Sequence, residues 1–321
     1  MNKKIFYLPE RDGISQSILA KFLSCRQLVK YDLQGWVSKY TSLALTHGTV
    51  GHAVLQFVYE GQRKNIIGAV PTKQQLTKII NHVKKLWLAD NPRPTRNMLQ
   101  DLELSLLFAD VVLQIYFDYW KKDIKILKWE KLEGEFKIPY QLKDGRNTFI
   151  RGKMDGTFRR NGLFLFETKF KSMINEENII DTLGIDMQVM VYLWALGKEY
   201  KLSPSGVLYN VIRRPGLRLG KTETLPQFGK RIEKDILRRT DFYFYRFEIA
   251  TDKEDLAKWS VEFEQMLTDF LNWWENKAGH YKNTGNCVNK YGRCNFLGAC
   301  AENQFYNLMK RKTVFRELEE N

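Results

Sequence analysis

The feature that most constrains the fold is a strand-like run in the middle of the chain, "GLFLFETKFKS" (162–172). It is almost wholly apolar until Glu167 and Lys169, and because side chains alternate along a strand, both charges project on the face of the leucines. Charges inside a sheet cost free energy unless they are paired or bound to a metal. The run therefore indicates either a solvated strand end with a surface ion pair or a site that performs chemistry.

A second carboxylate lies on the strand that precedes this run. Asp155, in "NTFIRGKMDGTFRR" (147–160), is separated from the run by "RRNG", which has the turn chemistry of a hairpin. If the two strands pair, Asp155 and Glu167 converge, and two close carboxylates repel each other unless a divalent cation lies between them. Such a cation binds a phosphate oxygen and lowers the pKa of its water. The pattern outlines a site that hydrolyses phosphodiesters.

The next predicted helix, over 183–199, offers two polar side chains. Gln188 and Tyr192 lie four residues apart and so share a face. The helix is apolar nearly all round, so core packing explains Tyr192 as well, although a buried glutamine needs hydrogen-bond partners. The Glu-x-Lys pattern has little specificity by itself, since it begins at Glu135, Glu167, Glu199 and Glu275.

A histidine upstream completes the candidates. His52 follows two glycines in "HGTVGHAVLQF" (47–57), and such small residues would let the helix approach another backbone closely. The alternatives are that His52 is a structural histidine or that His47 is the relevant one.

The net charge is +14, from 51 Lys plus Arg against 37 Asp plus Glu in 321 residues. This excess favours a polyanionic partner, with nucleic acid the commonest and an anionic membrane surface the alternative. The apolar runs are shorter than a membrane span, and "MNKKIFYLPERDG" at the start lacks the apolar core of a signal peptide. We expect a cytoplasmic protein that does not enter the membrane.

The four cysteines are Cys25 near one end and Cys287, Cys294 and Cys300 near the other. Disulfides are rare in cytosolic proteins, so three cysteines in one loop-rich segment indicate a metal or cluster site. Four thiolates can hold zinc or an iron–sulfur cluster. Zinc knuckles usually have two to four residues between cysteines, and the wider gaps here suit a cluster better.

Hydrophobic periodicity divides the chain into three regions. Residues 1–130, with Cys25 and His52, are predicted to be mainly helical, at 14–31, from Thr46 onward, at 73–89 and at 97–128. Residues 131–250 follow the order β-β-β-α-β, then a basic connection at 216–240 and a strand in "DFYFYRFEI" (241–249). Residues 251–321 comprise a helix at 252–277 and the cysteine segment. The predicted fold class is α/β, a mixed central sheet flanked by helices.

In this order along the chain, the candidate residues resemble the RecB-type branch of the PD-(D/E)XK nuclease superfamily. The motifs are "GTVGH" with His52, "GKMDG" with Asp155, "ETK" with Glu167 and Lys169, and "QVMVY" with Gln188 and Tyr192. The cysteines resemble those of its iron–sulfur members, which are AddB-type helicase–nuclease subunits, CRISPR-adaptation exonucleases and phage relatives. The resemblance spans residues 15–305, and Met154 stands where the superfamily's name has proline.

The resemblance implies a restriction-endonuclease-like core and a role for each residue. Mg²⁺ or Mn²⁺ would be held by His52, Asp155, Glu167 and the carbonyl of Thr168. Lys169 would position the attacking water, while Gln188 and Tyr192 would support the site or contact the strand beside the scissile phosphate. Because imidazole suits Mn²⁺ better than Mg²⁺, we expect higher activity with Mn²⁺. The four cysteines would hold a [4Fe–4S] cluster, with zinc as the alternative, and tie the two ends of the fold together.

By the same resemblance the chain would be a DNA exonuclease that acts on single strands or ends, in recombination, repair or phage DNA processing. The candidates for binding the DNA backbone are Arg213, Arg214, Arg218 and Lys221, in a basic loop (213–240) that is alternatively only a solvated surface. The sequence lacks a G-x-x-x-x-G-K-[ST] motif, so any unwinding would come from a helicase or recombination partner. The alternative functions are a non-cleaving DNA-binding or recombination-partner module, an RNA-directed nuclease and a CRISPR-adaptation factor that trims DNA. The setting expected is bacterial or phage-like.

Overall fold

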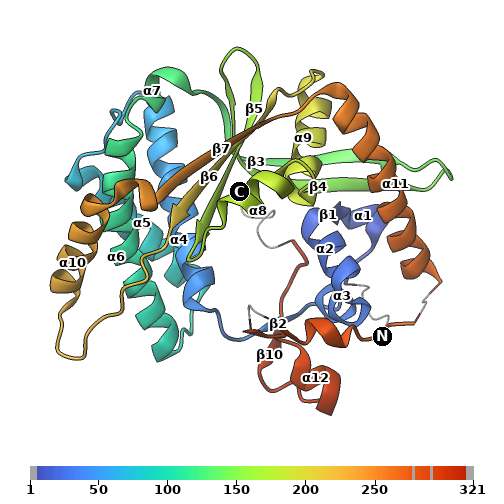
Figure 1. Ribbon diagram of the computed structural model, residues 1–321. Helices are drawn as coiled ribbons and strands as arrows, with labels where there is room; N and C mark the ends of the chain where they lie inside the picture. The colour runs from blue at the N-terminus through green and yellow to red at the C-terminus, as the bar shows by residue number, and fades with distance from the viewer. Residues whose placement is uncertain (1–5, 277–278, 290–291, 316–321) are drawn as a thin grey trace.

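The structure, a computed structural model, describes residues 6–276, 279–289 and 292–315 (Figure 1). The helices are α1 (Pro9–Asp12), α2 (Gln16–Ser24), α3 (Arg26–Leu33), α4 (Leu43–Arg63), α5 (Lys73–Asp90), α6 (Arg96–Tyr119), α7 (Asp123–Ile126), α8 (Glu176–Leu183), α9 (Met187–Tyr200), α10 (Leu225–Arg238), α11 (Lys253–Glu275) and α12 (Leu297–Glu302). The strands are β1 (Ile14–Ser15), β2 (Trp36–Ser38), β3 (Lys128–Gln141), β4 (Asn147–Arg159), β5 (Leu163–Lys171), β6 (Gly206–Arg213), β7 (Phe244–Ala250), β8 (Val288–Asn289), β9 (Gly292–Arg293) and β10 (Leu308–Lys310).

The central sheet is mixed, with the strand order β1-β4-β5-β6-β7, and β3 pairs along nearly the whole length of β4. The turn between β4 and β5 makes them antiparallel neighbours, as the "RRNG" segment predicts. β5 and β6 are parallel and joined through α8 and α9, while β7 is antiparallel to β6. This topology confirms the predicted mixed sheet flanked by helices.

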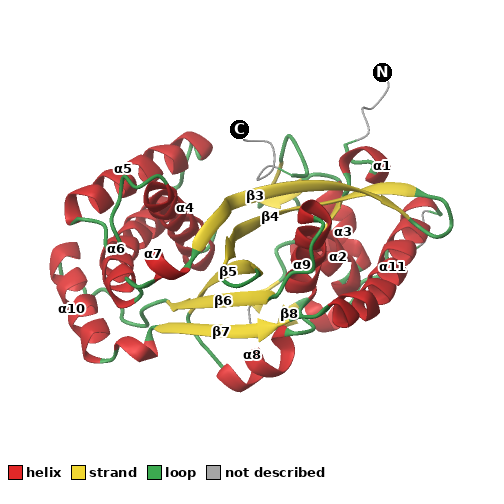
Figure 2. Ribbon diagram, turned by 90° about the horizontal axis from the view of Figure 1, so that it is seen from above, coloured by secondary structure: helices red, strands yellow, loops and turns green. Residues whose placement is uncertain are grey.

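Helices cover both faces of the sheet (Figure 2). On one face α4, α5, α6 and α10 form a core with Phe164 and Phe166 of β5. On the other face α2, α9 and α11 form a core with Leu163 and Leu165 of the same strand. The two cores confirm the alternation predicted for β5 and explain why its apolar run is continuous, because both of its faces are buried.

One edge of β4 is shared by two different strands. β1 pairs with it at Ile150 and Arg151, and β5 pairs with it from Gly156 to Arg159. Residues 152–155 lie between these two pairings. The last pair that joins β4 to β5 is Gly156↔Phe166, and the two strands separate at the next residues, Asp155 and Glu167. We call this place the fork.

Three local predictions are corrected. The helix predicted over 14–31 is two helices, because Cys25 between them has an extended backbone. The helix predicted over 97–128 ends at Tyr119, and the chain turns at Trp120 into α7 and β3. The basic connection predicted at 216–240 contains α10. Its apolar residues are few, but Phe228, Ile232 and Ile236 recur every four residues and are buried, which is sufficient for an amphipathic helix.

The C-terminal region packs back onto the N-terminal one. α11 matches the helix predicted over 252–277, whose last residue lies outside the described residues. β10 pairs with β2 in a small antiparallel sheet, and Phe296, Ala299 and Leu308 form a separate small core with Tyr31 and its neighbours. In the described ranges no single helix has the length and hydropathy of a membrane span, although the bent pair α8 and α9 does when taken together.

Two glycines one turn apart on α4 make a matched pair for a stability test. A Cβ added at Gly51 would lie 2.3 Å from Cζ of Phe170, whereas one added at Gly48 would meet nothing within 4 Å. We predict that Gly51→Ala lowers the free energy of unfolding by about 1–3 kcal/mol, because the Phe170 ring must move. Gly48→Ala should raise it by about 0.5–1 kcal/mol, as expected where a helical glycine gains a methyl group that meets no other atom. Urea unfolding measures both values, and equal stability of the two variants would contradict the close packing of α4 on β5.

Candidate active site

The fork brings together Asp155, His52 and the backbone of Thr168. Because β4 and β5 separate here, the Thr168 amide is free to donate to Asp155 Oδ2, at 2.7 Å. His52, projecting from α4, places its Nδ1 3.4 Å from Asp155 Oδ1. Gly51 allows this approach, since its missing side chain leaves room for Phe170 beside the His52 ring.

Glu133 of β3 also faces the fork, and the sequence reasoning missed it. It lies between the pairs Leu132↔Gly156 and Gly134↔Met154, so it stands opposite Asp155 on the neighbouring strand. Its backbone is left-handed, with a φ of 46°, which is uncommon for a residue with a side chain. One ligand atom from each of His52, Glu133 and Asp155 lies within 4.8 Å of the others. The available signal was the Glu-Gly pair inside a strand, since a strand glycine often marks an irregularity.

A second chain of polar contacts lies on the face of β5 that is directed at α9. Lys169 Nζ donates to Glu167 Oε1 at 2.5 Å and to Gln188 Oε1 at 2.7 Å. Gln188 Nε2 in turn donates to the Tyr192 hydroxyl at 3.3 Å, so the predicted shared face of α9 is directed at this site. Glu167 is only 2% exposed, and within the described part of the chain its Oε2 has no hydrogen-bond partner.

Burial and mutual repulsion dominate the electrostatics of these carboxyl groups. Burial and the Glu133 carboxylate raise the pKa of Asp155 to about 7. Burial and the Asp155 carboxylate raise the pKa of Glu167 to about 7 as well. Burial by itself lowers the pKa of Lys169, but the adjacent Glu167 outweighs it and holds that pKa above its usual range.

The two histidines of this segment have different surroundings. Burial lowers the pKa of His52, so its imidazole is neutral and carries a lone pair that a metal can accept. His47 is 2% exposed and packs edge-on against Phe108 and Phe170. Burial lowers the pKa of His47 to about 3, which makes it a neutral core residue.

The residues at the fork fit a divalent cation. Close carboxylates, a neutral imidazole and an unpartnered buried carboxylate oxygen together form the donor set that such ions take in proteins. Of the predicted metal residues, the structure groups His52 and Asp155 with Glu133. Glu167 lies next to this group and accepts a hydrogen bond from Lys169.

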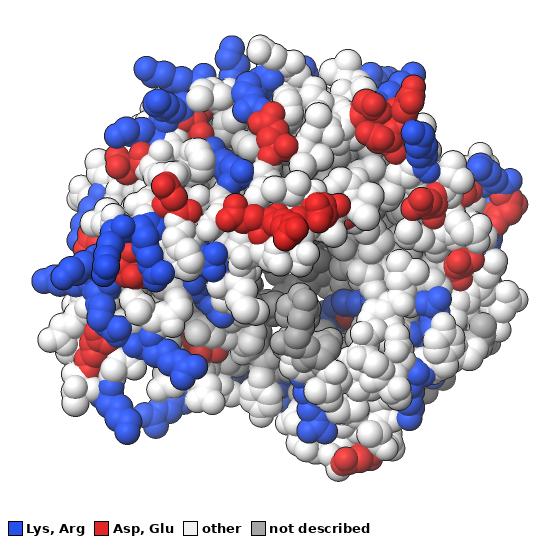
Figure 3. Space-filling model, in the orientation of Figure 1, with Lys and Arg blue, Asp and Glu red and all other residues white. Residues whose placement is uncertain are grey.

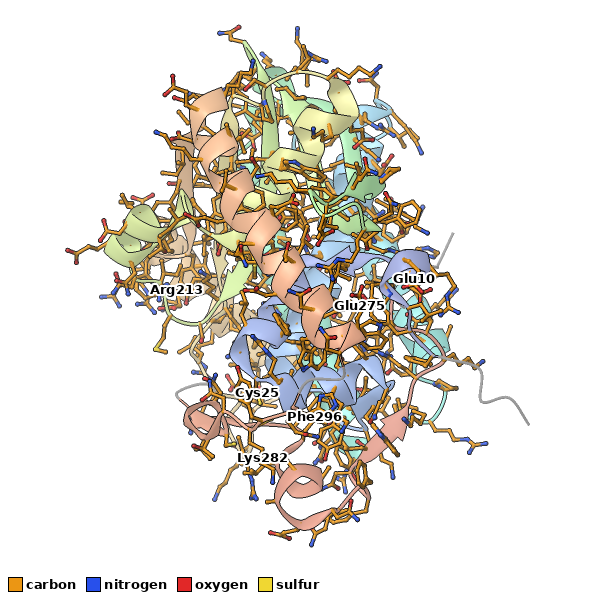
Figure 4. The ribbon with its side chains drawn as sticks, turned by 90° about the vertical axis from the view of Figure 1, so that its right-hand side faces the viewer. Glu10, Cys25, Arg213, Glu275, Lys282 and Phe296 are labelled. Carbon is orange, nitrogen blue, oxygen red and sulfur yellow. The ribbon has the colours of Figure 1, made fainter. Side chains whose placement is uncertain are left out.

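The four cysteines lie around one small cavity, although they come from opposite ends of the sequence. Cys25 Sγ accepts a hydrogen bond from the amide of Asn283 at 3.4 Å. Burial raises the pKa of Cys300, the Lys282 ammonium lowers it, and the three other cysteines raise it, which agrees with their position around the same cavity. Figure 4 shows Cys25 close to Lys282 and Phe296 at the base of the molecule, away from Arg213.

The predicted DNA-binding residues divide into two groups. Arg213 is held within the protein, because its Nε donates to the carbonyl of Phe242 at 2.8 Å and its guanidinium lies 3.9 Å from the Phe242 ring centre. Arg214 is half-buried, whereas Arg218 and Lys221 are exposed. Figure 3 shows basic side chains gathered over α10 and the loop before it, and a row of acidic side chains over α8 with a hollow in the surface below it.

A sequence model of the PD-(D/E)XK nuclease superfamily matches residues 13–301. Among solved structures, the chain is similar to a protein from Eubacterium rectale provisionally described as an exonuclease, with 14% identity over 94% of this chain and 91% of that one and a TM-score of 0.49. It is also similar to the protein SSO0001, with 13% identity over 81% and 79% of the two chains and a TM-score of 0.33. No curated protein sequence matches the chain significantly.

The raised carboxyl pKa values predict how the stability of the metal-free protein depends on pH. Asp155 and Glu167 have a folded pKa of about 7 against ordinary values of 3.8 and 4.5, so between these limits the native state binds more protons than the unfolded state. The free energy of unfolding that these groups contribute therefore falls as pH rises from about 4 to 7. Asp155→Asn removes one titrating carboxyl group, and it also removes the negative charge that raises the pKa of Glu167. Urea unfolding should show that the free energy of unfolding falls less between pH 5 and pH 8 for this variant than for wild type. Parallel pH profiles of the two proteins would contradict the raised pKa values of Asp155 and Glu167.

Proposed function

Because the chain belongs to the PD-(D/E)XK nuclease superfamily, we propose that it is a metal-dependent exonuclease of the RecB type. Its reaction is the hydrolysis of phosphodiester bonds in single-stranded DNA or at DNA ends. The observation that carries this proposal is the fork, where the ligand atoms of His52, Glu133 and Asp155 lie within 4.8 Å of one another beside the Glu167–Lys169 pair.

Each residue at the fork has a role that its contacts support. His52, Glu133, Asp155 and Glu167, together with the carbonyl of Thr168, would hold Mn²⁺ or Mg²⁺. The bound ion would supply a Lewis acid for the phosphate and lower the pKa of a coordinated water. Glu133 enters this set because of its position opposite Asp155. The imidazole of His52 favours Mn²⁺ over Mg²⁺.

Lys169 is the residue that directs the water. Its ammonium is fixed by two acceptors, Glu167 Oε1 and Gln188 Oε1, and retains a third donor for a water molecule or a phosphate oxygen. Because the adjacent Glu167 keeps the pKa of Lys169 above its usual range, the group remains a cation that stabilises the charge developing on the phosphate. Gln188 and Tyr192 hold Lys169 in this orientation.

The charges around the fork support a DNA substrate. The exposed Arg218 and Lys221, with Lys230, Lys234 and Arg238 of α10, offer cations for the DNA backbone. Helix α8 carries exposed carboxylates that repel phosphates, at Glu176, Glu177 and Asp181. This asymmetry would guide a strand to the fork along the basic surface.

We also propose that the four cysteines hold a [4Fe–4S] cluster that joins the ends of the chain. A single zinc ion with Zn–S bonds of about 2.3 Å would bring its sulfur atoms to about 3.8 Å from one another. Among the described residues, the three-ligand group within 4.8 Å contains His52, Glu133 and Asp155 and no thiol. The wider spacing of thiols around one cavity suits a cluster, whose irons bind separate cysteines. In this view the nuclease core is 131–250, and 1–130 and 251–321 close around it.

Digestion of end-labelled single- and double-stranded DNA tests the nuclease. Wild type should degrade DNA with a divalent cation, faster with Mn²⁺ than with Mg²⁺. Lys169→Ala and Asp155→Asn should each lose roughly 100-fold or more in rate, as expected when a proton-directing group or a metal ligand is removed. Lys121→Ala, which removes an exposed lysine that pairs with Asp118 on the surface away from the fork, is the control. Binding of DNA without cleavage by wild type would favour the non-cleaving module, and cleavage of RNA alone would favour the RNA-directed nuclease.

The cluster is tested on protein purified without oxygen. We expect iron and sulfide, with a broad absorption shoulder near ~400 nm. Cys287→Ser should lose this absorption and unfold at a lower temperature, whereas Val288→Ala, at a 67% exposed neighbouring position, should keep both. A colourless wild-type protein with one zinc per chain would refute the cluster and leave the nuclease proposal intact.

A further inference from the structure

Three polar residues form a row across adjacent strands that begins at the fork and leads away from it. Thr168 of β5 pairs with Asn210 of β6, and Asn210 pairs with Arg246 of β7. They lie on the face of the sheet that α4 and α6 cover, opposite to the face of Glu167 and Lys169. Thr168 and Asn210 are at most 1% exposed, and the side chain of Arg246 is 9% exposed. Polar groups so deeply buried need hydrogen-bond partners.

The hydrogen bonds run in one direction along this row. Arg246 Nε donates to Asn210 Oδ1 at 3.2 Å, and Asn210 Nδ2 donates to Thr168 Oγ1 at 3.3 Å. Arginine can only donate, so the amide oxygen of Asn210 must face Arg246 and the amide nitrogen must face Thr168. The row therefore has a single hydrogen-bonding arrangement, which orients the Thr168 side chain.

Arg246 is the anchor of the row. Its guanidinium makes two bonds to Asp123 of α7, at 2.9 and 2.6 Å, and a third to the Tyr116 hydroxyl at 3.0 Å. It also lies 3.8 Å from the ring centre of Trp120. A buried cation held by a bidentate carboxylate, a phenol and an indole has little freedom to move.

The position of Thr168 connects the row to the chemistry. Its amide donates to Asp155 Oδ2, and its neighbours in sequence are Glu167 and Lys169. A change in its backbone direction would move the hydrogen bond to Asp155 and turn the side chains on either side. Stability alone does not account for this arrangement, because replacing a buried ion pair by apolar residues of similar volume is often neutral or stabilising.

We propose that Thr168, Asn210 and Arg246 are positioning residues, which fix the Asp155 carboxylate and the strand between Glu167 and Lys169 in the geometry that binds a divalent cation. The inference rests on the proposed function, since it takes Asp155 as a metal ligand. Asn210 and Arg246 lie away from the fork and act on it through Thr168, which lines the same small pocket as His52, Glu133 and Asp155.

Thr168→Val and Thr168→Ser make the decisive comparison. Valine keeps the volume and removes the acceptor for Asn210, whereas serine keeps the hydroxyl and removes the methyl group. Calorimetric titration with Mn²⁺, in the absence of DNA, should show affinity about tenfold weaker for Thr168→Val and close to wild type for Thr168→Ser. At saturating Mn²⁺ the cleavage rate of Thr168→Val should recover. Equal Mn²⁺ affinity in the two variants would overturn the inference.

Arg246→Lys provides a second test if Thr168→Val fails to fold. Lysine keeps the charge but cannot bond Asp123 with two parallel donors while also reaching Asn210, so Mn²⁺ affinity should again fall about tenfold. Arg160→Lys is the matched control, because Arg160 pairs with Glu248, two residues along β7 from Arg246, without joining the row. Wild-type affinity in Arg246→Lys would contradict the role of the anchor. Failure of wild type itself to bind Mn²⁺ would instead refute the proposed function.

Discussion

The structure depends on the repulsion among carboxylates that the fold forces together at the fork. Asp155 and Glu133 stand opposite each other on paired strands, and Glu167 follows on the strand that separates from them. Burial removes the water that would screen these charges, which is why the pKa of both Asp155 and Glu167 rises to about 7. Protons relieve this repulsion in the metal-free protein, and a divalent cation relieves it at neutral pH.

The two faces of β5 divide the work of the site. Glu167 and Lys169 project toward α9, where Gln188 fixes the ammonium group. Thr168 projects toward α4 and α6, where a row of hydrogen bonds leads away from the fork to a buried ion pair. Because a strand alternates its side chains, one tripeptide serves both faces, and the backbone amide in its centre reaches Asp155 in the gap between the strands.

The sequence was sufficient for the parts of the site that depend on local geometry. Alternation along β5 and the turn before it predicted that Asp155 and Glu167 converge. Spacing along α9 placed Gln188 and Tyr192 on one face. The repeated Glu-x-Lys pattern was not informative by itself, since Glu199 and Glu275 form surface ion pairs with Lys131 and Arg146. Burial distinguishes Glu167 from both.

The parts that the sequence did not predict depend on contacts between distant segments. Glu133 itself has a left-handed backbone within β3. Most residues avoid this backbone conformation, and no pattern of apolar positions indicates it. Asn210 and Arg246 meet Thr168 because of the register of β6 between β5 and β7. That register cannot be read from the sequence, because the helical connection from β5 to β6 can have many lengths. α10 was missed because its apolar face is carried by few residues.

The most direct test of the account is the position of a bound ion. Crystals soaked in Mn²⁺ give an anomalous difference map in which manganese is identified independently of the protein atoms. We expect a peak at the fork, about 2.0–2.3 Å from oxygen atoms of Asp155 and from a ring nitrogen of His52. A map without a peak there, from crystals whose protein cleaves DNA in solution, would contradict it.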